Sequence, residues 1–133
     1  MQSQIDSLKT QLNNVYKPGL GEFMSSIQVH HEKLWFAGKA QNWKLADFEI
    51  DEMMEAVDDI KTYASNRPET KYIVMLQLPI DSLDKSIQQK NEAVFTRSFM
   101  LLTTTCNNCH MEVHYDFNKV KIPETPPFSN QVF

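Results

Sequence analysis

Helix-breaking residues are scarce in this chain of 133 residues, and that scarcity limits the folds open to it. Glycine occurs only at positions 19, 21 and 38, and no proline lies between positions 80 and 122. Both residues weaken or interrupt helices, so stretches without them favour helix. In the same stretches apolar residues recur at alternating steps of three and four, the period of one helix face. The sequence therefore predicts an all-α protein.

Four amphipathic segments with short connections are expected after a short N-terminal helix over residues 1–16. They run over residues 20–40, 42–64, 69–90 and about 91–117, and Asn42 and Asn91 have the side chains of N-caps. The segment 69–90 is expected to be a broken helix with Pro79 at a kink or a restart. Its apolar run 72–76, taken alone, is equally compatible with a strand. Four such segments predict an antiparallel four-helix bundle.

The chain is expected to have three parts. Residues 1–17 form an extra amphipathic helix, residues 18–120 form the bundle, and the proline-rich residues 121–133 form a C-terminal tail. Phe128 and Phe133 suggest that this tail packs on the bundle. The N-terminal helix can pack on the domain or pair with another copy in a homodimer. Its apolar stripe consists of Ile5, Leu8, Leu12 and Val15.

Composition narrows the possible partners. A net charge of −4 and a pI near 5.5 argue against nucleic acid or an anionic membrane. No apolar run approaches the roughly 20 residues that span a bilayer. The N-terminus also lacks the apolar core of a signal peptide, so an exported form of this chain would have lost its leader.

The only two cysteines lie in the pentapeptide Cys106-Asn107-Asn108-Cys109-His110. Two cysteines three apart, followed at once by histidine, form the attachment signature of c-type haem. On a helix these three side chains share one face. Cys106 and Cys109 would form thioether bonds to one porphyrin, and the His110 imidazole would bind its iron. The cysteines also continue the apolar seam that starts at Phe95, so the motif is expected to face the core.

Three other interpretations of the pentapeptide remain open. A zinc site needs four ligands, and His110 with His114 would complete one cysteine pair only with strain. A thioredoxin-like dithiol is expected in a βαβ context, which the sequence lacks. The pentapeptide can also consist of two small buried side chains and an incidental histidine.

The segment 20–40 offers candidates for the second axial ligand. In an antiparallel bundle the end of the last helix lies beside the start of this one, which places Met24 opposite His110. Met24 can equally be a flexible core residue. His31 is the alternative ligand, but it lies about 10 Å further along the helix at 1.5 Å per residue, so both cannot bind one iron. An open position is the third possibility.

These segments resemble the cytochrome c prime class and its four-helix relatives. The resemblance rests on the pentapeptide near the end of the last helix, and it extends over roughly residues 20–131. It includes residues 20–24, 31–38 and 42–43, and the tail Pro126-Pro-Phe-Ser-Asn-Gln131. The resemblance implies one covalent haem c and a periplasmic location in a Gram-negative bacterium, with the signal peptide removed. The N-terminal helix has no counterpart in that class.

The expected function is electron transfer by a monohaem c-type cytochrome with an unidentified redox partner. Methionine–histidine ligation would raise the reduction potential. The acidic face of segment 42–64 is a solvated surface or a docking surface for a basic partner. It consists of Asp47, Glu49, Asp51, Glu55, Asp58 and Asp59. No pattern resembles a catalytic triad, a phosphate loop or a carboxylate pair, so an enzyme is not expected. The alternative function is a five-coordinate haem protein that binds or senses small gases such as NO and CO.

Overall fold

The computed structural model describes the backbone of residues 2–15 and 19–133, and the side chains of residues 2–8 and 19–133. The described residues contain helices and no strand, so the all-α prediction is confirmed. Five segments are α-helices and one is a 3-10 helix, η1. They are α1 (Gln2–Val15), α2 (Leu20–Lys39), α3 (Trp43–Tyr63), η1 (Pro68–Leu76), α4 (Gln77–Gln88) and α5 (Glu92–Glu112).

Both predicted N-caps are confirmed. The Asn42 side chain accepts a hydrogen bond from the Leu45 backbone N–H at 3.3 Å, and the Asn91 side chain accepts one from Val94 at 3.1 Å. Each bond satisfies one of the N–H groups that a helix start leaves without a partner inside the helix. The caps mark the first residues of α3 and α5.

The chain changes its helix type before Pro79. Residues 68–76 form the tighter η1, and α4 begins at Gln77. The predicted broken helix is therefore confirmed, but it restarts at Gln77 and not at Pro79, and the strand alternative is wrong. Pro79 is the third residue of α4 and is buried. In the first turn of a helix a missing N–H costs no intrahelical bond, so proline is accommodated there.

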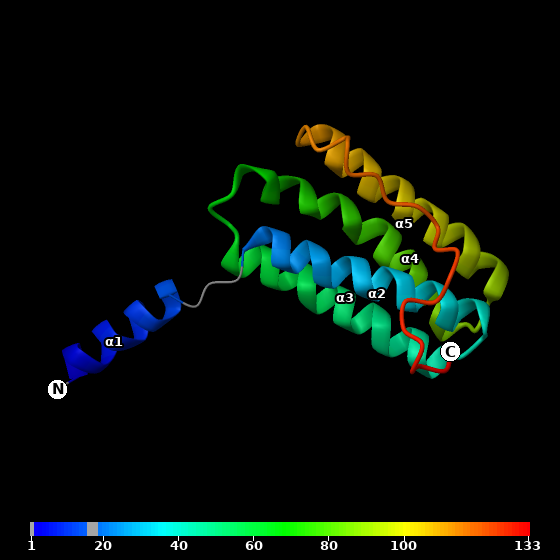
Figure 1. Ribbon diagram of the computed structural model, residues 1–133, viewed down its shortest axis with the longest axis horizontal. Helices are drawn as coiled ribbons and strands as arrows, with labels where there is room; N and C mark the ends of the chain where they lie inside the picture. Colours follow the sequence, from blue (N-terminus) through cyan, green and yellow to red (C-terminus); the bar gives the residue numbers. More distant parts are fainter. Residues whose placement is uncertain (1, 16–18) are drawn as a thin grey trace.

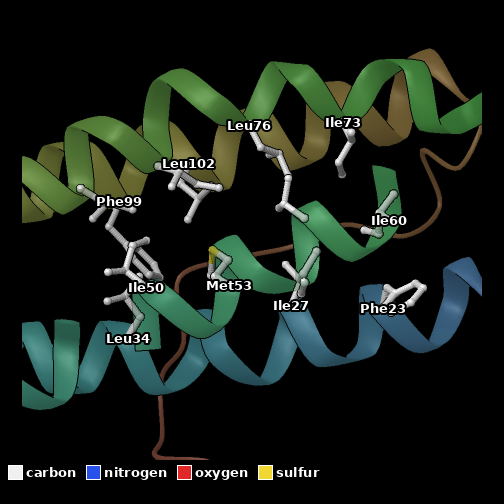
Figure 2. Close-up of a cluster of buried hydrophobic side chains, with 14 of the residues drawn as sticks. Phe23, Ile27, Leu34, Ile50, Met53, Ile60, Ile73, Leu76, Phe99 and Leu102 are labelled. Carbon is white, nitrogen blue, oxygen red and sulfur yellow. The ribbon is translucent and has the colours of Figure 1, made fainter. Parts of the chain in front are cut away.

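Helices α2 to α5 enclose one apolar core. Contacts join α2 with α3, α3 with α4, α4 with α5, and α5 with α2. The start of α2 and the end of α5 lie at the same end of these packed helices (Figure 1). Figure 2 shows the core side chains directed between the helices. Trp35 and Trp43 pack against this core beside Phe95.

Helix α1 lies outside the packed helices in Figure 1. Ile5 is 45% exposed and Leu8 is 65% exposed. Leu12 and Val15, the rest of the predicted stripe, lie outside the described side chains. Pairing of this helix with a second copy therefore stays a prediction. None of the described helices is long and apolar enough to cross a membrane.

One member of the predicted acidic surface of α3 is not on the surface. Glu49 is 1% exposed, and its carboxylate lies 2.6 Å from Nδ1 of His30 on α2. Assigning Glu49 to the solvated face was wrong because its helical position faces α2, where a histidine supplies a partner. Asp51, Glu55 and Asp58 are exposed, as expected for that face.

Helix α5 ends at Glu112, five residues before the predicted end near Phe117. The chain turns at His114, whose φ of 66° lies in the left-handed region. The His114 side chain is exposed. The following residues run back along the packed helices (Figure 1). Near the end of the chain Phe133 lies 5.7 Å from Phe36, centroid to centroid, and Lys33 lies over the Phe128 ring.

Candidate functional site

The last two turns of α5 carry the pentapeptide. Cys109 is buried, and Cys106 and His110 are half-buried. Because residues 106, 109 and 110 share one helical face, all three side chains reach the space between α5 and the start of α2. Cys106 packs against the hydrophobic core, as the apolar seam of this segment predicts.

Two adjoining cavities lie between α5 and α2, with volumes of about 210 and 240 Å³. Gly21, Met24, His110 and Asn118 line both of them. Cys106 lines only the first cavity, and Cys109 lines only the second. Binding sites for small molecules commonly measure roughly 300 to 1,000 Å³, a range that the two cavities reach only in combination. Met24 and His110 therefore border a shared space that has one cysteine on each side.

A backbone carbonyl determines that Nδ1 of His110 carries a proton. Nδ1 of His110 lies 2.6 Å from the Asn118 carbonyl oxygen, which can only accept a hydrogen bond. Nδ1 must therefore carry a proton, and in the neutral imidazole Nε2 keeps a lone pair. This tautomer is the one that binds a metal through Nε2, with the other ring nitrogen held by an acceptor.

His31 also borders the first cavity, but Nε2 of its ring is hydrogen-bonded to Thr103. Thr103 donates its hydroxyl proton to the Phe99 carbonyl at 3.0 Å, so the hydroxyl oxygen accepts from Nε2–H of His31 at 2.9 Å. Burial lowers the pKa of His31 to about 4. His31 lines only the first cavity, whereas Met24 lines both cavities together with His110.

The buried His31 is expected to make the protein less stable in acid. The unfolded chain protonates this ring near pH 6.5, but the folded chain protonates it only near pH 4. The unfolded state binds more protons between these values, so the free energy of unfolding falls as the pH falls through this window. The loss reaches about 3 kcal/mol if the whole shift is expressed.

The contribution of His31 to the free energy of unfolding can be measured by urea unfolding. The wild type and His31→Gln are each unfolded above pH 6.5 and near pH 4. Glutamine keeps a donor for Thr103 but does not titrate. The wild type should therefore lose more stability than the variant over this window. Both proteins have the same carboxylates, which titrate in the same range and cause the same loss in each. Equal total losses would therefore contradict the lowered pKa of His31.

Neither of the two thiols loses its proton readily. Burial, with the neighbouring Cys109, raises the pKa of Cys106 to about 12, and burial raises the pKa of Cys109 as well. Dithiol redox chemistry and zinc binding both use the thiolate. Within the described part of the chain, no three His, Cys, Asp or Glu side chains are grouped to hold a metal ion.

The sequence did not predict several residues that shape this site. Met53 of α3 lines the first cavity, and an ion pair between Arg67 and Glu69 borders the second. Residues 118–120 return to α5 and border the first cavity. Met53 follows the core period of its helix, so its spacing gave no sign of a site. No local pattern shows where a returning loop will lie.

Chemically, the site combines an imidazole with a free Nε2, a thioether sulfur and two protonated thiols around an apolar space. Aliphatic side chains and Met53 form part of the lining: Leu20, Ile27, Met53, Ile60, Ile73, Leu102, Val113 and Val120. Polar side chains, among them Gln28, Arg67, Glu69 and Lys119, form another part. An imidazole Nε2 and a thioether sulfur are both side-chain groups that can bind a transition metal. Comparison of the chain with protein-family models, with curated proteins and with solved structures gave no match.

Proposed function

We propose that this protein is a monohaem c-type cytochrome that transfers electrons, and that it acts in the periplasm. Helices α2 to α5 form its antiparallel four-helix bundle, α1 is an additional helix, and residues 121–133 are a tail that packs on the bundle. One observation carries the proposal. Met24 and His110 border both cavities, and each cavity has one cysteine of the Cys-x-x-Cys-His motif.

The residues of the site fit the proposed group. Cys106 and Cys109 would form thioether bonds to the porphyrin, with their thiols already on the cavity side of α5. His110 would bind the iron through Nε2, because its Nδ1–H is donated to Asn118. Haem c supplies the one-electron chemistry by cycling its iron between ferric and ferrous states.

Met24 is the proposed distal ligand. Its flexible thioether lies on α2, on the lining shared by both cavities. Gly21, one turn earlier on the same helix, has no atom within 4 Å of the place where a Cβ would lie, so the space beside Met24 is open. Methionine opposite histidine raises the reduction potential of a haem, as suits an electron carrier.

Covalent attachment is tested by expressing the full chain behind an export signal together with cytochrome maturation machinery. We expect a haem that survives extraction with acid acetone and stays on the polypeptide in a denaturing gel. The variant Cys106→Ser with Cys109→Ser is the control and should lose this haem. Haem that the solvent extracts from the wild type, or that never appears, would refute the proposed function.

A further inference from the structure

Asn107, between the two cysteines, has both of its side-chain polar atoms bonded to one distant residue. Its Nδ2 donates to the Val120 carbonyl at 2.8 Å, and its Oδ1 accepts from the Val120 N–H at 2.7 Å. The amide thus pairs with a backbone residue 13 positions later in the chain. Asn108, its neighbour in the motif, is exposed. The two spacer residues of the motif therefore differ in what they do.

This pair of bonds fixes the segment whose carbonyl contacts His110. Asn118 lies two residues before Val120, and its carbonyl oxygen accepts from Nδ1 of His110. The Asn118 N–H is bonded to the Tyr115 carbonyl at 2.9 Å, and the Tyr115 N–H to the His110 carbonyl at 2.7 Å. The turn after α5 is thus held at its start by backbone bonds and at its end by Asn107.

We propose that Asn107 is a positioning residue, which holds residues 118–120 so that the Asn118 carbonyl keeps the proton of His110 on Nδ1. This inference rests on the proposed function, in which His110 Nε2 is the iron ligand. A carbonyl that accepts from the far side of a ligating imidazole orients the ring and increases its basicity. A more basic imidazole stabilises ferric iron more than ferrous iron, so this contact lowers the reduction potential.

The experiment compares Asn107→Ala with Asn108→Ala in the haem-bound protein. Asn107→Ala should raise the reduction potential, and NMR should show faster solvent exchange of the His110 ring proton. Exchange of the Val120 amide should accelerate roughly tenfold, since one net hydrogen bond is worth about that factor. Asn108→Ala removes an exposed amide from the same motif, so all three quantities should stay at the wild-type values.

A second variant covers the case in which Asn107→Ala does not fold. Asn107→Asp keeps the acceptor for the Val120 N–H but replaces the donor with a carboxylate that faces the Val120 carbonyl. It should accelerate the ring-proton exchange as alanine does. Its added negative charge favours ferric iron, so its potential is not compared. If Asn107→Ala changes the Val120 exchange alone, with the potential and the His110 proton as in the wild type, or if Asn107→Asp changes the Val120 exchange but not that of the His110 proton, Asn107 only holds the loop and the inference is wrong.

Failure of the proposed function gives a different result. If the wild type carries no covalent haem, the potential cannot be measured, but the tautomer of His110 still can be, by ¹⁵N NMR of the haem-free chain. The inference about positioning then expects Nδ1–H in the wild type and in Asn108→Ala, and a shift toward Nε2–H in Asn107→Ala. An unchanged tautomer in Asn107→Ala would overturn it.

Discussion

Replacing Met24 with alanine is expected to convert a low-spin ferric haem into a high-spin one and to let the ferrous protein bind CO readily. Met24 shares the lining of both cavities with His110, and in the proposed cytochrome it would be the distal ligand. Its removal should also lower the reduction potential, on the order of 0.1 V within the roughly 0.8 V that axial ligation spans. Absorption spectra of both oxidation states, CO titration and a redox titration measure the three effects.

Two matched variants separate Met24 from its neighbours in the first cavity. Met53→Leu removes the other thioether with little change in volume, and His31→Gln removes the other imidazole. Both should keep the low-spin spectrum. If His31→Gln alone gives the high-spin form, His31 is the distal ligand. A wild-type protein that is already high-spin and binds CO would contradict the Met24 assignment and favour the gas-binding alternative.

Replacing Gly38 with alanine is expected to destabilise the fold by roughly 3 kcal/mol, the upper part of the range for overpacked cores. A Cβ at position 38 would overlap the ring of Phe95, which is fully buried on α5. The ring cannot withdraw, because Trp35, Trp43 and Phe99 surround it. The helix propensity gained from alanine, at most about 1 kcal/mol, does not offset this overlap.

Equilibrium unfolding in urea measures the loss, and Gly19→Ala is the control. Position 19 is exposed and has no atom within 4 Å of the point that a Cβ would occupy, so the same change there should alter stability by less than about 0.5 kcal/mol. The double variant Gly38→Ala with Phe95→Leu should be more stable than the sum of the single changes predicts, because leucine frees space for the methyl group. Additive losses would mean that the two positions do not compete for space.

Much of the helical structure was predictable because its causes are local. Asn42 and Asn91 cap helices through bonds to residues three positions ahead. The steps of three and four that start at Phe95 include Phe99, Leu102 and Cys109, all of which α5 buries. The η1 segment was not predictable in this way, because its apolar run 72–76 is compatible with a strand, a helix or a 3-10 helix when read alone.

The sequence by itself determined that the chain is all-helical and that its two cysteines and His110 share the core face of the last helix. Periodicity and capping act within a few residues, so they can be recognised without a fold. The sequence also predicted Met24 opposite His110, and the tertiary structure added that both border the same two cavities. The tertiary structure alone decided that Glu49 is buried against His30 and that Asn107 holds Val120. Each of these contacts joins residues far apart in the sequence, and only the packing of the helices brings them together.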